Sequence, residues 1–151
     1  MRLGARHEPR PGRATRLANV LIENVTGSSL SRIASSITGI PGGRRPRGIT
    51  LRNVDLTMPG GATAAMGFGR PVPEAERRYP ENRMFGHILP AWGLYVRHAD
   101  DVRLENVRLR LAADDARPSA VVTSDVTGLT TSACNFTPAA ETRPLRLARP
   151  R

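Results

Sequence analysis

The segment Asp101-Val-Arg-Leu-Glu-Asn-Val-Arg-Leu109 is the most informative about the fold, because close copies of it occur elsewhere in the chain. Two copies precede it, Asn19-Val-Leu-Ile-Glu-Asn-Val-Thr26 and Gly48-Ile-Thr-Leu-Arg-Asn-Val-Asp-Leu56, and Gly128-Leu-Thr-Thr-Ser-Ala-Cys-Asn-Phe136 is a weaker fourth copy. The copies begin 29, 53 and 27 residues apart. A phrase that recurs at a nearly fixed period is the signature of a repeat architecture.

Within each copy, apolar and polar residues alternate as in a strand with one buried face. The alternation changes phase at the asparagine: in the second copy the apolar positions are 49 and 51 before it, but 54 and 56 after it. Such a change indicates a bend, and asparagine tolerates the left-handed backbone conformation of a tight corner. When the copies stack, these asparagines can bond side chain to side chain: Asn24, Asn53 and Asn106.

A strand, a corner and a second strand that recur every 27–29 residues predict an all-β, parallel β-helix of about four coils over residues 17–136. A further strand is expected before three of the copies, at residues 36–40, 93–96 and 120–122. The spacing of 53 residues contains about 25 extra residues, and the prolines between positions 59 and 90 indicate a long loop there. Because no capping helix precedes residue 17, we expect the chain to be the end of a longer solenoid.

The charge of the chain is concentrated at its two ends. All 23 cations among the 151 residues are arginines, and the formal net charge is +10. Residues 1–16 carry +4 and residues 137–151 carry +3; both segments lack apolar periodicity and are predicted to be basic disordered tails. A nucleic-acid binder acting through these tails is one function class to consider. No recognition motif accompanies the tails, so nucleic acid is not the expected partner.

Other classes are excluded by what the sequence lacks. No apolar run approaches the roughly 20 residues of a membrane helix, and no hydrophobic segment follows the N-terminal arginines as it would in a signal peptide. A P-loop, a dinucleotide fingerprint and a nucleophile elbow are absent. Cys134 is the one cysteine, and His7, His87 and His98 are too scattered for a metal site. We therefore expect no membrane partner, no metal and no cofactor.

The repeated phrase and the segment Ser35-Ser-Ile-Thr-Gly-Ile-Pro-Gly42 resemble the later coils of glycoside hydrolase family 28, the polygalacturonase-like pectin hydrolases. Two further segments, Tyr79-Pro-Glu-Asn-Arg-Met-Phe-Gly86 and Leu89-Pro-Ala-Trp-Gly-Leu-Tyr-Val-Arg-His98, look like the long loop of bacterial members. The resemblance covers about residues 17–136. It implies a right-handed parallel β-helix, a pectin-type polysaccharide as the substrate of the complete protein, and secreted or periplasmic relatives.

The catalytic motifs of this family are not present. They are an Asn-Thr-Asp, an Asp-Asp, a Gly-His-Gly and an Arg-x-Lys on earlier coils, whereas this chain has no Asn-Thr-Asp, no Gly-His-Gly and no lysine. Its Asp-Asp pairs at 100–101 and 114–115 are interpreted as solvated turn carboxylates. The expected function is therefore that of a C-terminal fragment of a glycoside hydrolase, inactive alone and without catalytic residues. The alternative is a non-catalytic carbohydrate-binding or structural β-helix.

Candidate sugar contacts lie in and beside the long loop: Tyr79, Glu81, Arg83, Trp92 and Arg97. Aromatic rings stack on sugars, a guanidinium grips a uronate carboxylate with two donors, and a glutamate accepts a hydroxyl. The alternative is that the aromatic residues, with Met84 and Phe85, pin the loop against the coils. His98 is interpreted as a turn residue bonded to backbone. The chain is expected to be a monomer or to self-associate through exposed coil ends.

Overall fold

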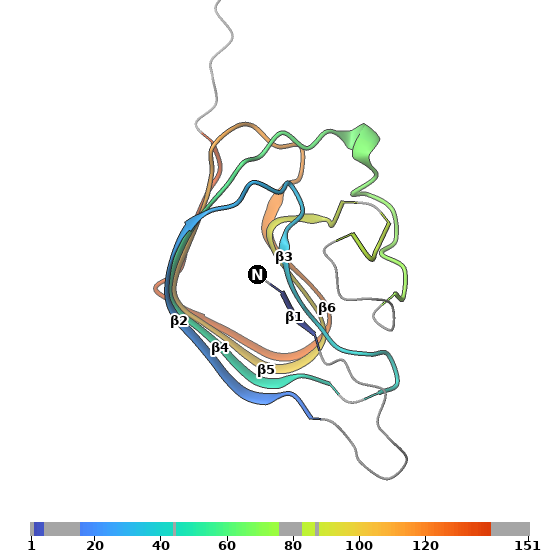
Figure 1. Cartoon of the computed structure of the whole chain (residues 1–151), viewed down its shortest axis with the longest axis vertical. Coiled ribbons are helices and arrows are strands. Elements are labelled where there is room, and N and C mark those ends of the chain that lie inside the picture. Colours follow the sequence, from blue (N-terminus) through green and yellow to red (C-terminus); the bar gives the residue numbers. More distant parts are fainter. Residues whose placement is uncertain (1, 5–15, 44, 76–82, 87, 140–151) are drawn as a thin grey trace, which may run out of the picture.

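The structure is a computed structural model that describes residues 2–4, 16–43, 45–75, 83–86 and 88–139. These residues form one all-β, seven-stranded sheet and a short 3-10 helix, η1 (Ala64–Met66). The strands are β1 (Arg2–Gly4), β2 (Ala18–Ser28), β3 (Ser35–Thr38), β4 (Arg47–Met58), β5 (Ala91–Leu111), β6 (Ser119–Ser132) and β7 (Asn135–Thr137). All of these strands pair in parallel, and the sheet curls like a half-barrel around an apolar interior (Figure 1).

The four copies of the phrase lie side by side in this sheet. Ile49 of β4 pairs with Val20 of β2 on one side and with Val102 of β5 on the other, and Val102 pairs in turn with Leu129 of β6. Residues at equivalent positions of the aligned copies are therefore paired with one another in the sheet. A second row of strands consists of β1, β3 and the first parts of β5 and β6, and β3 lies across the interior from β2 (Figure 1).

The asparagines form the corner and the stack that the sequence predicts. Asn24, Asn53 and Asn106 have φ values of 57°, 51° and 51°, which lie in the left-handed region. The Nδ2 of Asn53 donates to the Oδ1 of Asn24 at 3.1 Å, and the Nδ2 of Asn106 donates to the Oδ1 of Asn53 at 3.0 Å. Ala133 occupies the same position in the weaker copy, with a φ of 51°. Both predictions are confirmed.

The end of this asparagine stack gives a first testable prediction. We expect Ala133→Asn to raise the free energy of unfolding by about 1 kcal/mol, because asparagine tolerates a positive φ and its amide can donate to Asn106. We expect Asn53→Ala to lower it by about 1–3 kcal/mol, since the central member of the stack both donates and accepts a bond. Urea unfolding followed by circular dichroism measures both changes. A loss of stability in Ala133→Asn would contradict this account of the corner.

The change of phase in the phrase also appears in the burial of the side chains. Ile49 and Leu51 before the corner, and Val54 and Met58 after it, all point into the buried interior. Strand β5 repeats this pattern and contributes most of the remaining core residues: Trp92, Leu94, Val96, Ala99, Val102, Leu104, Val107 and Leu109. The bend therefore keeps apolar side chains directed inward on both sides of the corner.

Some segments differ from the expectation for the tails. The backbone of Arg2–Gly4 forms β1 and pairs with Ser36–Thr38, although these residues belong to the expected basic tail 1–16. Strand pairing uses backbone groups, and the sequence of residues 2–4 contains no side-chain pattern that indicates a strand. The end of β7 at Thr137 reaches one residue into the second expected tail, 137–151. Residues 5–15 and 140–151 lie outside the described residues.

The expected long loop, residues 59–90, contains η1 and no strand in the parts that the structure describes. These parts are residues 59–75, 83–86 and 88–90. In the described part of the chain, no helix has the length and apolar character needed to cross a membrane.

Candidate functional site

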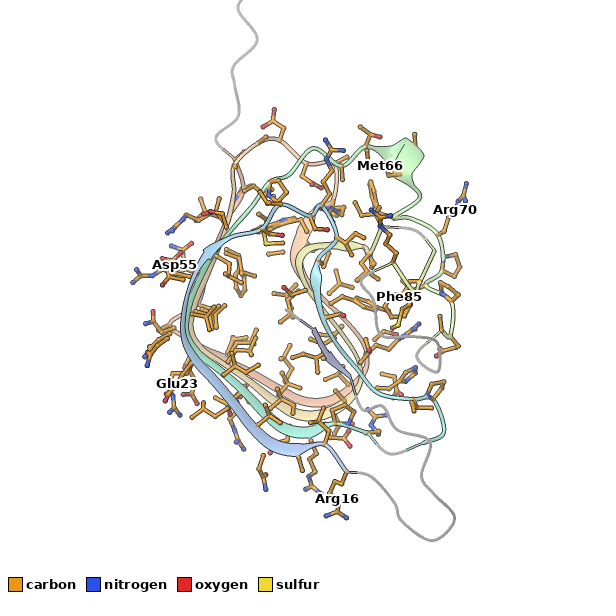
Figure 2. The ribbon with its side chains drawn as sticks, viewed as in Figure 1. Arg16, Glu23, Asp55, Met66, Arg70 and Phe85 are labelled. Carbon is orange, nitrogen blue, oxygen red and sulfur yellow. The ribbon has the colours of Figure 1, made fainter. Side chains whose placement is uncertain are left out.

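The long loop is packed against the second row of strands by its own small apolar cluster. Met84 and Phe85 are buried together with Ala75 and Tyr95, and the rings of Phe85 and Tyr95 meet edge to face with centroids 6.4 Å apart. Figure 2 shows Phe85 on the loop side of the second row. Met84 and Phe85 therefore pin the loop, which is the alternative that the sequence left open for them.

Arg97 of β5 is the second anchor of this loop. Its side chain is 3% exposed, and its guanidinium donates to the carbonyl oxygens of Val72 and Pro73, each at 2.8 Å. The guanidinium carbon lies 5.1 Å from the centroid of the Phe85 ring and 5.8 Å from that of Tyr95, within the range of cation–π attraction. The sequence predicts Arg97 as a contact to a uronate carboxylate, but both of its terminal nitrogens instead bind the backbone of the loop.

The other predicted sugar contacts are dispersed. Trp92 is buried in the main core, on the opposite face of β5 from the loop cluster, so its ring offers no face to a sugar. Arg83 is exposed at the start of a described loop segment and remains available to a ligand. Tyr79 and Glu81 lie outside the described residues. The structure therefore leaves Arg83 as the described candidate with an accessible side chain.

A charged cluster lies beside the anchored loop, where the chain bends between the two rows of strands. The Nδ1 of His98 lies 2.6 Å from the Oδ2 of Asp125 on β6, and its Nε2 lies 3.0 Å from the Oε2 of Glu74 in the loop. His98 and Asp125 both occupy corners, with φ values of 50° and 51°. The prediction that His98 bonds to the backbone is wrong for its side chain. The two ring nitrogens instead lie within hydrogen-bond distance of the carboxylates of Asp125 and Glu74.

Arg45 completes this cluster from the opposite side. Its Nε donates to Asp100 at 2.8 Å, and its Nη1 donates to the Oδ2 of Asp125 at 2.7 Å. Its Nη2 donates to the backbone carbonyls of Ala99 and Asp125. Hydrogen bonds from Arg45 and then from His98 hold the pKa of Asp125 below its ordinary value. Each carboxylate of the cluster is thus bonded to a guanidinium or an imidazole.

The sequence carried an unused signal for this cluster. Arg45, His98 and Asp125 each stand three residues before a copy of the repeated phrase, at positions 48, 101 and 128. Residues at equivalent positions of stacked repeats fall into one column, so the same alignment that predicts the asparagine stack also places these three side chains together.

The side chain of Asp115 is buried, so the prediction of a solvated turn carboxylate is wrong for this residue. The side chains of Arg117 and Asp115 are 1% and 0% exposed, and the Nε and Nη2 of Arg117 donate to Asp115 at 2.8 and 2.7 Å. The Nη1 of Arg117 donates to the carbonyls of Arg32 and Ala91. Burial is tolerated because both charges are paired and bonded. Asp114 is exposed, as expected, while Asp100 and Asp101 are partly exposed and paired with arginines.

Because the pKa values of Asp115 and Asp125 are lowered in the folded chain, we expect the free energy of unfolding to fall in acid. Burial raises the pKa of Asp115, but hydrogen bonds from Arg117 and from the Ala62 amide outweigh burial and leave the pKa below its ordinary value. A carboxylate with a lowered folded-state pKa stabilises the fold at neutral pH, and that contribution is lost as the pH falls below about 4. Urea midpoints measured between pH 6 and pH 2 should therefore fall.

The variant Asp125→Asn tests the source of this acid sensitivity, because it removes one of the two lowered carboxylates. We expect its urea midpoint to depend less on pH than that of the unchanged chain. Asp114→Asn is the matched control and should keep the full dependence, since Asp114 is exposed. Equal pH profiles for Asp125→Asn and the unchanged chain would overturn the assignment.

Comparisons of the chain with protein-family models, with curated proteins and with solved structures found no match. Among the described residues, no group of three or more His, Cys, Asp or Glu side chains is placed to hold a metal ion. A functional assignment therefore rests on the residues and geometry of the chain itself.

Proposed function

We propose that this chain is a right-handed parallel β-helix from the C-terminal portion of a polygalacturonase-like glycoside hydrolase. In this role it supplies stacked coils and a loop beside the cleft for a pectin-type polysaccharide, whereas the catalytic carboxylates lie elsewhere in the complete protein. The observation that carries the proposal is the parallel, in-register pairing of the four copies of the phrase that resembles the later coils of this family.

The stacking of the repeats supports the β-helix part of the proposal. Each copy of the phrase pairs in parallel and in one register with the next, and the corner at Asn24, Asn53, Asn106 and Ala133 keeps the same backbone conformation in every copy. A parallel solenoid requires this repetition, because each coil buries its apolar face only against its neighbours. The right-handed sense is that of the family that the sequence resembles.

The pairing of the carboxylates supports the absence of catalysis. Inverting hydrolysis requires one carboxylic acid and one free carboxylate on opposite sides of the scissile bond. Glu74 and Asp125 are two carboxylates beside the described part of the loop, and the ring of His98 lies within hydrogen-bond distance of both. Asp115, which accepts from the Ala62 amide of the loop, is paired with Arg117. Asp100 and Asp125 also share Arg45. These groups hold the loop and the corner in place.

The proposal is tested by titrating the purified chain with trigalacturonate and, separately, with maltotriose, each followed by NMR chemical shifts. We expect the uronate to bind and the neutral sugar not to bind, because the accessible loop cation, Arg83, pairs with a carboxylate. Arg83→Ala should weaken binding about tenfold, the loss of one charge-assisted hydrogen bond. Arg108→Ala, which removes an exposed arginine of β5, is the control. No reducing ends should be released from polygalacturonate, and their release would overturn the proposal.

A non-catalytic carbohydrate-binding or structural β-helix is the second candidate. The burial of Trp92 and Arg97 favours its structural form, because both predicted sugar contacts serve the core or the loop anchor. The same titrations distinguish the candidates: binding of neither sugar favours a structural role, and equal binding of both sugars favours a general carbohydrate-binding module.

A further inference from the structure

The two outer strands of the stack expose apolar positions that are buried in the middle. Ile49 and Val102 lie between two strands and are 0% exposed, whereas Leu129, in the same column at the β6 end, is 36% exposed. Val20, at the β2 end of this column, is only partly buried. Among the described residues, β2 pairs only with β4. In this described part of the chain, both ends therefore present partly exposed apolar positions and a strand edge without a partner strand.

The described residues of these edges carry few of the features that usually prevent edge pairing. Natural edge strands carry several charges, prolines or bulges. Strand β2 contains Glu23 as its one charged residue and has no proline, and Leu21 on the same strand is 48% exposed. The second half of β6, from Val126 to Ser132, contains no charged residue and no proline. Each edge can therefore accept another parallel strand.

We propose that copies of this chain stack head to tail, with β6 of one copy paired in parallel with β2 of the next. The stack then continues the register already present within the chain: Leu129 meets Val20, Thr131 meets Ile22 and Cys134 meets Val25. This proposal concerns copies of this chain by itself, without any further coils, and it is independent of the proposed function and of the identity of any polysaccharide.

The corners favour this orientation. Gly128 lies in β6 and Ala133 directly follows this strand, and their φ values are 75° and 51°. Asn19 and Asn24 of β2 have φ values of 55° and 57°. In head-to-tail stacking these bends coincide, as Gly48 and Asn53 coincide with Asn19 and Asn24 within the chain. The edges then follow the same outline along their whole length.

A two-fold pairing of β2 with β2 fits less well. The antiparallel arrangement about the strand centre places Glu23 opposite its own copy, and like charges directly opposite each other are destabilising. Head-to-tail stacking instead places Glu23 beside the uncharged Ser132, following the column that joins Glu23, Arg52, Glu105 and Ser132. A head-to-tail contact without rotational closure leaves a free edge at each end, so assemblies grow with concentration.

The test uses sedimentation equilibrium of the full chain over a range of concentrations. We expect the average mass to rise through dimer and trimer without a ceiling. Ile22→Arg blocks the β2 edge and Thr131→Arg blocks the β6 edge, because each places a cation at an interior position of one column. Each variant alone should be monomeric. An equimolar mixture should form a dimer and nothing larger, since it combines one free β6 edge with one free β2 edge.

Met66→Arg is the matched control, because it changes an exposed apolar residue of η1 in the loop, and it should assemble like the unchanged chain. Circular dichroism confirms folding; if Ile22→Arg does not fold, Thr131→Arg and the unchanged chain still decide the question. A monomeric unchanged chain at all concentrations would overturn the proposal. Dimers of Thr131→Arg alone would show β2–β2 pairing, and dimers of Ile22→Arg alone would show β6–β6 pairing; either result would overturn it as well.

Discussion

Replacing Asp115 with alanine is expected to lower the free energy of unfolding by about 3–5 kcal/mol, a large part of the stability of a domain of this size. The reason is that Arg117, whose side chain is 1% exposed, loses the carboxylate that accepts hydrogen bonds from two nitrogens of its guanidinium. A buried guanidinium without its counter-charge is more costly than the absence of the whole pair. Urea unfolding at pH 7, followed by circular dichroism, measures the change.

The neighbouring residue provides the control for this prediction. Asp114 is exposed, so Asp114→Ala should change the free energy of unfolding by no more than about 0.5 kcal/mol. The double variant Asp115→Leu, Arg117→Met should recover part of the loss, because it removes both charges together. Equal stabilities for Asp115→Ala and Asp114→Ala would show that the buried pair does not carry this part of the fold.

Replacing Arg97 with methionine is expected to release the long loop while the stacked strands remain folded. The variant loses two charge-assisted hydrogen bonds to the carbonyls of Val72 and Pro73, each worth about 1.5–3 kcal/mol. A loss of about 3 kcal/mol raises the population of the open loop by roughly a hundredfold. Chymotryptic cleavage after Phe85, which is buried in the closed loop, should accelerate by the same factor.

Two further variants separate the loop anchor from general effects of losing an arginine. Arg97→Lys keeps the charge but not the planar two-donor fork, so its cleavage rate should lie between those of the unchanged chain and Arg97→Met. Arg110→Met removes an exposed arginine that pairs with Asp55 on the outer face of the other row, and it should leave cleavage unchanged. An unaltered rate in Arg97→Met would mean that the apolar cluster alone holds the loop.

The stacking of the strands was predictable because the information is local. Each copy of the phrase contains the alternation that directs side chains inward and an asparagine that tolerates the corner, as at Asn53 and Asn106. Aligning the copies then gives the register, because equivalent residues of successive repeats lie side by side. The same alignment predicts the long loop, as extra residues between two copies.

The roles of the charged residues were less accessible to sequence reasoning. The sequence pattern predicts a ligand contact at Arg97 and a solvated turn residue at Asp115, yet the side chains of both are buried. A charge can be buried only where partners surround it, and those of Arg97 lie 24 and 25 residues earlier in the loop. The column of Arg45, His98 and Asp125 was visible in the alignment, but not its link to Glu74 of the loop.

The pattern of the repeated phrase indicates which of its residues face the interior, where each copy bends and which copies are neighbours. These properties follow from the period of the apolar residues and from backbone preferences, both contained within about nine residues of the phrase. Tertiary contacts, in contrast, bring Arg2–Gly4 into the sheet, hold the loop through Arg97 and pair Arg117 with Asp115 in the interior. Those outcomes depend on which backbone groups and counter-charges the fold brings close, and no local pattern in the chain encodes that proximity.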